Sequence, residues 1–270
     1  MADVHSAKTG ASDICEPILD PKIPTFRSFE TERLEVEGDM WKGGFGKLIK
    51  KRNAGRIFKM SSSSEAKQDA FITDKEAREA IYIDFEGFVE KSPTLVGVLI
   101  EGEFEQTVFD LRLFPAAEAK GLQMAALPDF VAEMVELSLK QNRCIVAYSQ
   151  HEKNLILKYA GIGPGDRYRD ARKIAVRWKK RLYPTQNIKG YGLKDFLKFI
   201  NYPRGDYLGE METTSRLRAV IGMLERRVNY NKLTPVVKAK WTKLLQHNKI
   251  DCTGMCALTL RAAKEIAASG

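Results

Sequence analysis

The chain lacks the long apolar run that a membrane-spanning segment requires. No stretch of its 270 residues approaches the roughly 18 uncharged apolar residues of a transmembrane helix. The first ten residues include Asp3, His5 and Lys8 and lack the apolar core of a secretory signal. We therefore expect no membrane association and a cytoplasmic location.

Cysteine is scarce, and its spacing argues against a disulfide framework. The four cysteines are Cys15, Cys144, Cys252 and Cys256, and no two of them form a CxxC pair. We expect reduced thiols. The last two also raise a zinc hypothesis with His247 and His151. On a helix their shared face would lie about 100° from Asp251, so we expect them to pack in the core instead.

Acidic residues are absent from residues 41–60, a segment that carries seven lysines and arginines and three aromatic side chains. The whole chain has a net charge of +9, which favours polyanionic partners such as nucleic acid. Basic residues interleaved with aromatics are typical of single-stranded nucleic acid binding. The competing interpretation, which we slightly favour, is a solvated hairpin whose aromatics dock on the main domain. Gly43, Gly44 and Lys47 resemble a phosphate loop only superficially, because no serine or threonine follows the lysine. We interpret residues 1–75 as an irregular basic arm.

Regular hydrophobic patterns begin near residue 80 and indicate one domain over residues 76–270. Strands are predicted at residues 80–86, 94–101, 106–113 and 144–148. Helices are predicted at residues 127–142, 151–160, 168–182, 193–200, 213–227, 235–246 and 251–268. The order is three strands in an antiparallel meander, a helix, a parallel strand and then helices. It predicts an α/β protein of the ribonuclease H-like fold, with a mixed central sheet flanked by helices.

Acidic residues follow the apolar core of the first and fourth predicted strands. Asp84 and Glu86 are two residues apart, so both project from the same face of their strand. Glu152 opens the helix after the fourth strand, which is expected to lie parallel to the first. Like charges held together need a cation to neutralise them, so these acids predict a metal site. The competing interpretation is a solvated strand end and a helix-dipole contact at Glu152.

A further acid, Asp251, lies four residues after His247 in the last third of the chain. On a helix this spacing places both side chains on one face. A neutral imidazole there could accept a proton from an attacking water, because its unperturbed pKa lies near working pH. Asp251 could alternatively cap a helix.

Four segments together resemble the DEDD-type 3′–5′ exonucleases of the ribonuclease H-like superfamily, and within them the predicted RNase H-like nuclease subgroup. The segments are YIDFEG at 82–87, Glu152 at its strand-to-helix junction, YGLKDFL at 191–197 with NYPR at 201–204, and HNKIDC at 247–252. The resemblance covers residues 80 to 265. It implies that Asp84, Glu86, Glu152 and Asp251 hold two Mg²⁺ or Mn²⁺ ions and that His247 is the general base.

The chain departs from that family at two of these positions. Glu152 stands where most members carry aspartate, although the subgroup often carries glutamate. Only three residues separate His247 from Asp251, a spacing at which the family usually has tyrosine, since its histidine branch uses one residue more.

The resemblance implies a metal-dependent nuclease that removes nucleotides from a single-stranded 3′ end of DNA or RNA by a two-metal-ion mechanism. Two alternatives are a noncatalytic nucleic-acid-binding module with the same fold and an endonuclease on the same scaffold. The choice between DNA and RNA and the oligomeric state are open at this stage.

Overall fold

The computed structural model describes residues 71–88, 92–161, 163–205 and 212–269. The basic segment 41–60, Cys15 and most of the predicted arm therefore lie outside the described residues. The strands are β1 (Ile81–Gly87), β2 (Pro93–Ile100), β3 (Glu103–Val108), β4 (Gln123–Met124), β5 (Ile145–Ala147) and β6 (Tyr168–Asp170). The helices are α1 (Asp74–Glu79), α2 (Phe114–Glu118), α3 (Leu127–Lys140), α4 (Gln150–Ala160), α5 (Ala171–Leu182), α6 (Leu193–Phe199), α7 (Thr213–Arg227) and α8 (Pro235–Ala268).

The six strands form one mixed sheet in the order β4-β3-β2-β1-β5-β6. The meander β1-β2-β3 is antiparallel, whereas β4, β5 and β6 pair in parallel with their neighbours. Strand β1 pairs with β5 through Ile81 opposite Ile145 and Tyr82 opposite Val146. The predicted fold class is confirmed, and the sheet is broadly compatible with a ribonuclease H-like fold.

Alternation along β1 sorts its side chains between the two faces of the sheet. Ile81 and Ile83 are buried in the cluster that includes side chains of α3 and α4. Tyr82 is buried in a different cluster, with side chains of α5, α6 and α8. Asp84 and Glu86 follow Tyr82 at intervals of two, so both carboxylates point toward the face that α8 covers.

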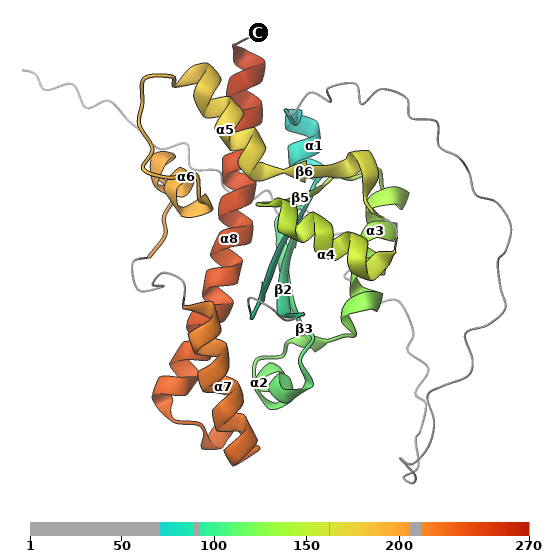
Figure 1. Cartoon of the computed structure of the whole chain (residues 1–270), viewed down its shortest axis with the longest axis vertical. Coiled ribbons are helices and arrows are strands. Elements are labelled where there is room, and N and C mark those ends of the chain that lie inside the picture. The colour runs from blue at the N-terminus through green and yellow to red at the C-terminus, as the bar shows by residue number, and fades with distance from the viewer. Residues whose placement is uncertain (1–70, 89–91, 162, 206–211, 270) are drawn as a thin grey trace, which may run out of the picture. The chain divides into compact units, whose positions relative to one another are not determined.

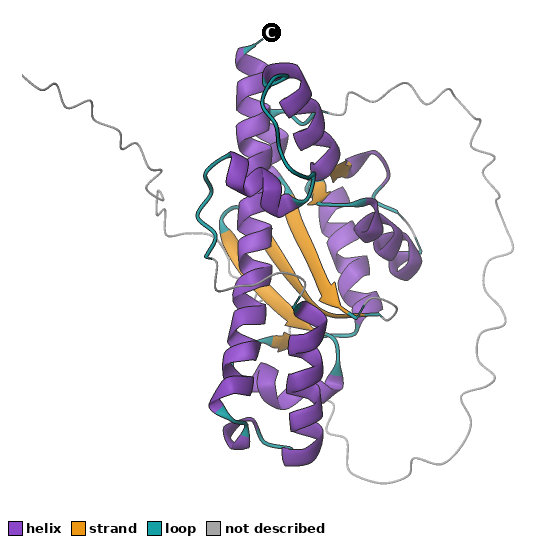
Figure 2. Cartoon of the chain, turned by 60° about the vertical axis from the view of Figure 1, so that its left-hand side comes forward, coloured by secondary structure: helices purple, strands orange, loops and turns teal. Residues whose placement is uncertain are grey.

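Helices cover both faces of the sheet. Helices α3 and α4 lie against one face, and α8 crosses the other with α5, α6 and α7 packed along it (Figures 1 and 2). The α8 face has two apolar clusters. One contains Trp178 and Met255, and the other contains Trp241 and Leu217. Helix α8 contributes to both clusters and therefore links the two ends of this layer.

The C-terminal region is one helix of 34 residues, not the two helices predicted at 235–246 and 251–268. Thr234 caps its start, and the intervening residues include neither glycine nor proline, so nothing breaks the helix there. Asp251 consequently lies in the middle of α8 and does not cap a helix. Despite this length, no helix in the described ranges has an apolar stretch long enough to cross a membrane.

Two further predictions of local structure were wrong, and three short elements were missed. Tyr168–Asp170 is a strand, and Asp170 then caps α5 by accepting a hydrogen bond from the Lys173 backbone N–H. Strand β3 begins and ends earlier than predicted, because Asp110 caps a short 3-10 turn at Leu111–Leu113. The short elements α1, α2 and β4 were not predicted. Each is too short to produce a clear hydrophobic period.

Candidate metal centre

Strand β1 and the middle of α8 bring together residues that lie more than 160 positions apart. Asp84 and Glu86 leave the same face of β1, and Glu86 precedes a register shift at Gly87. His247 and Asp251 are one turn apart on α8, which packs on that face. Both side chains therefore face β1, as their four-residue spacing predicts.

Glu86, His247 and Asp251 form the tightest part of this arrangement. His247 Nε2 lies 3.4 Å from Asp251 Oδ2 and 3.9 Å from Glu86 Oε1. One potential ligand atom from each residue falls within 4.8 Å of the other two. The side chains of Glu86 and Asp251 are only 11% and 20% exposed, so the cluster is recessed but reaches solvent.

The spacing of these atoms fits a divalent cation. With metal–ligand bonds of about 2.1 Å, adjacent octahedral ligand atoms lie about 3 Å apart and opposite ones about 4.2 Å apart. The separations in the cluster are close to this range. The two carboxylates of this set are ligands that suit Mg²⁺ and Mn²⁺.

Asp84 lies beside the cluster and is held by Asn248. The Asn248 amide nitrogen donates to Asp84 Oδ2 at 2.8 Å and to the Asp84 backbone carbonyl at 2.9 Å. The Asn248 carbonyl oxygen accepts from Gln106 Nε2 at 2.8 Å. Asn248 is fully buried, and its two hydrogen-bonding ends connect β1 to β3.

This bridge depends on the residue that lies between those strands. Gly97 of β2 is opposite Asp84 on one side and opposite Gln106 on the other. A Cβ atom at position 97 would lie 2.3 Å from Asn248 Oδ1, so the Asn248 side chain would have to leave its position. Glycine therefore leaves the space that the Asn248 side chain occupies.

Burial raises the pKa values of all three acids, and repulsion raises two of them further. Burial raises the pKa of Asp84 well above its usual range, and the charges of Glu86 and Asp251 raise it further. Burial also raises the pKa of Glu86 to about 7, against hydrogen bonding from Thr213 and the charge of Arg216. Such a cluster retains protons until a cation replaces them.

Asp251 and His247 share one positive neighbour. Burial raises the pKa of Asp251 to about 6, although the charge of Arg204 opposes the shift. Burial lowers the pKa of His247 to about 4, and Arg204 and Arg216 contribute to this decrease. His247 is therefore neutral at neutral pH, as a general base must be.

The tautomer of His247 follows from its contact with Arg204. Arg204 Nη2 lies 3.2 Å from His247 Nδ1, and a guanidinium can only donate, so Nδ1 accepts. The imidazole proton is then on Nε2, which faces Glu86 and Asp251. In this arrangement the proton on Nε2 lies on the side of Asp251 Oδ2, 3.4 Å away, and the tautomer must change before Nε2 can accept a proton from water.

Glu152 is placed near the acids but is engaged in a local interaction. Its Oε2 accepts hydrogen bonds from the Ser149 backbone N–H at 3.0 Å and from Ser149 Oγ at 2.6 Å. These contacts close a capping box at the start of α4. The charge of Glu152 also contributes to the raised pKa of Asp84, so the two carboxylates are within electrostatic range.

The zinc hypothesis finds no support among the described residues, where no metal-ligand group includes a cysteine. Cys252 is fully buried in the apolar cluster of α8, and His151 is exposed.

Several residues of this centre were not identified from the sequence as having a role. They are Asn248, Gln106, Gly97, Arg204 and Arg216. Two signals were visible: a glycine within the apolar run of β2, which often marks a close approach of another group, and the places of Asn248 and Arg204 within the segments HNKIDC and NYPR.

Comparison with known proteins finds no matching family model, no similar curated protein and no similar solved structure.

The raised pKa values predict that Glu86→Gln stabilises the metal-free protein at high pH. The folded state binds the Glu86 proton more tightly than the unfolded chain, whose value is near 4.5, so the wild type loses stability as pH rises from there through about 7. We expect the variant to be more stable by on the order of 2 kcal/mol at pH 8 and equal to the wild type near pH 4. Urea unfolding in the presence of a chelator measures this difference.

The lowered pKa of His247 changes the pH dependence of stability in the opposite direction. This effect is present in both proteins and therefore largely cancels in the comparison. Glu105→Gln, at an exposed position of β3, is the matched control, and an identical pH profile for the two variants would contradict the prediction.

The bridge predicts that Asn248→Ala lowers the free energy of unfolding by about 2–3 kcal/mol, because buried groups of Asp84 and Gln106 lose their partners. Gln246→Ala, at an exposed position of the same helix, should change it by less than about 0.5 kcal/mol. Urea denaturation measures both values. Equal stability of the two variants would show that the bridge is energetically unimportant.

Proposed function

We propose that this protein is a metal-dependent nuclease of the DEDD type, a 3′–5′ exonuclease that hydrolyses phosphodiester bonds of DNA or RNA. The observation that carries the proposal is the convergence of Glu86, His247 and Asp251 beside Asp84. These residues come from a strand and a helix that lie far apart in the sequence, on a sheet compatible with the ribonuclease H-like fold. The sequence resemblance around the same residues supports it independently.

Each residue has a role that its position allows. Asp84, Glu86, Glu152 and Asp251 would hold two Mg²⁺ or Mn²⁺ ions. When bound, the ions supply an activated water and stabilise the leaving oxygen. Glu152 would bind through the carboxylate oxygen that the Ser149 cap leaves available, since both capping bonds go to Oε2.

His247 and Arg204 would act on the substrate side of the centre. A neutral His247 can receive a proton from the attacking water once its tautomer has changed. The Arg204 Nε–H group is buried and has no hydrogen-bond partner among the described residues. Such a donor suits a phosphate oxygen, whose charge Arg204 would offset.

A noncatalytic nucleic-acid-binding module is the second candidate. The observation that favours it is the capping box, because one carboxylate oxygen of Glu152 is already occupied. In such a module the acids would not hold metal ions.

We expect Asp84→Asn and Asp251→Asn to reduce Mn²⁺-dependent hydrolysis of a 5′-labelled single-stranded oligonucleotide by at least about a hundredfold. DNA and RNA strands are tested separately. Loss of one nucleotide at a time from the 3′ end identifies exonuclease action, and a product ladder on end-blocked strands identifies endonuclease action. Glu105→Gln is the control and should retain activity. Full activity of Asp84→Asn with an unchanged circular dichroism spectrum would refute the assignment.

Titration with Mn²⁺ separates the two candidates. At a hundredfold excess over Kd, a cation that binds only the folded state stabilises it by about 2.7 kcal/mol, which is about 5–10 °C in Tm for a domain of this size. The increase should disappear in the double variant Glu86→Gln, Asp251→Asn. Oligonucleotide binding by a wild type whose Tm does not respond to Mn²⁺ would favour the noncatalytic module.

A further inference from the structure

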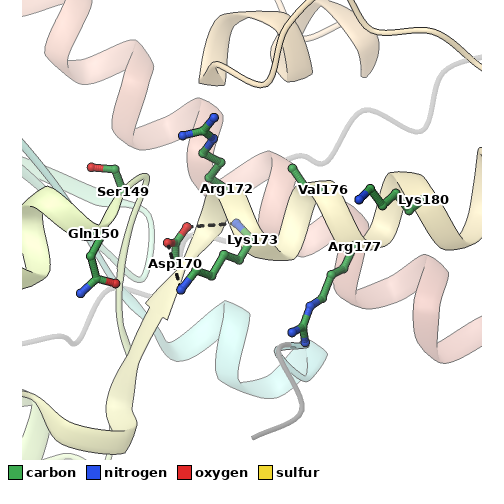
Figure 3. A pocket seen from close by; sticks show the side chains of 8 residues that line it. All are labelled: Ser149, Gln150, Asp170, Arg172, Lys173, Val176, Arg177 and Lys180. Atoms are coloured by element: carbon green, nitrogen blue, oxygen red, sulfur yellow. Dashed lines mark hydrogen bonds and ion pairs between the residues drawn. The ribbon is translucent and has the colours of Figure 1, made fainter. Parts of the chain in front are cut away.

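A basic cavity of about 560 Å³ lies between the start of α4 and one face of α5. Arg172, Lys173, Val176 and Lys180 follow that face of the helix, while Ser149 and Gln150 lie across from its first turn (Figure 3). Arg177 also lines the cavity. The cavity has no role in the proposed chemistry, so the concentration of basic residues around it requires a separate explanation.

The packing of α5 forces these cations outward. Ile174, Ala175 and Trp178 on the opposite face are buried against α8 and its neighbours. Residues 172, 173, 176, 177 and 180 therefore form one exposed or half-buried stripe. From Arg172 to Lys180 the stripe is about 12 Å long at 1.5 Å per residue. That length would match about three phosphates at the 3.4 Å rise of one strand in duplex DNA, and fewer along an extended single strand.

The positive charge of this stripe is largely uncompensated. Helix α5 contains no acidic residue. Within the described part of the chain the one ion pair at the cavity joins Lys173 to Asp170, at 4.0 Å. Arg172, Arg177 and Lys180 have no acidic partner there. Exposed helix faces are ordinarily stabilised by pairs of opposite charge, so like charges at these positions indicate an external polyanion.

Ser149 connects the cavity to the candidate metal centre. It lines the cavity and also donates two hydrogen bonds to Glu152. A strand lying on α5 would therefore pass directly beside a proposed metal ligand. The carboxylates of Glu86 and Asp251 are recessed, so a single strand can reach them more readily than a rigid duplex.

We infer that this cavity and the basic stripe of α5 bind the phosphate backbone of a single-stranded nucleic acid and lead it to the metal centre. The direction of the strand toward the metal centre rests on the proposed function. The binding itself is inferred from the positive charge of the α5 stripe and the shape of the cavity. Backbone contacts carry no base information, so the stripe binds DNA and RNA of any sequence.

The test is the triple variant Arg172→Gln, Arg177→Gln, Lys180→Gln in the full-length chain. Binding of a 12-nucleotide fluorescent single strand is measured by anisotropy in EDTA, where no metal-dependent cleavage occurs, over a series of NaCl concentrations. We expect affinity at 100 mM NaCl to fall at least about tenfold. The slope of log K against log salt should become shallower by about 2, since each phosphate contact contributes about 0.7 for a single strand.

The matched control is Arg226→Gln, Arg227→Gln, Lys232→Gln, which removes the same charges from exposed positions at the other end of the layer, around the end of α7 (Figure 1). It should leave the slope unchanged. Equal losses in the two triple variants would overturn the inference, because net charge alone would then explain binding. A triple variant at α5 that binds the strand normally but loses affinity for phosphatidylserine vesicles would overturn it in favour of a lipid surface.

The binding measurement is independent of catalysis. If the wild type binds the strand through α5 but cleaves no substrate with Mn²⁺, the proposed activity fails and the inference stands. If cleavage requires Asp84 and the α5 variant binds and cleaves as the wild type does, the activity stands and the inference fails.

Discussion

The packing of α8 across one face of the sheet is the constraint on which the candidate centre depends. Without it, Asp84 and Glu86 would be two acids at the end of a strand, and His247 and Asp251 would be one turn of a polar helix. The contact is specified by Asn248, whose single amide group bonds to both β1 and β3. A buried amide with both ends satisfied fixes the position of the helix along its axis more strictly than apolar packing does.

The electrostatics of the centre follow from that packing. Burial brings three carboxylates into an environment that penalises their charge, and the charge of Asp251 raises the pKa values of Asp84 and Glu86 further. The charge of Arg216 offsets part of this cost at Glu86, and the charge of Arg204 offsets part of it at Asp251. The centre therefore stores unfavourable energy that a divalent cation would relieve, which is a common arrangement at functional sites.

Much of the architecture could be predicted because it depends on local periodicity. The two-residue alternation of β1 placed Asp84 and Glu86 on one face, and the four-residue spacing placed His247 beside Asp251. The parallel pairing of β1 with β5 followed from the order of strands and helices. Strand β6 could not be predicted in this way, because Tyr168–Asp170 is only three residues long and is defined by pairing with β5.

The middle of α8 was misjudged for an informative physical reason. Two helices were predicted there, at 235–246 and 251–268, with Asp251 as a possible cap of the second. Here the polar residue Asn248 is buried because its partners, Asp84 and Gln106, are themselves polar groups of the sheet. The sequence alone does not reveal such a partner 164 positions away.

The continuity of α8 also determines how the centre can be lost. The same helix places Trp241 in one apolar cluster, Met255 in the other, and His247 and Asp251 between them. It carries no internal proline, and its one glycine, Gly254, packs against Leu197, so the helix has no obvious hinge. Assembly of the centre is thus inseparable from global folding, and a partly unfolded intermediate that keeps either cluster without the other would have no intact centre.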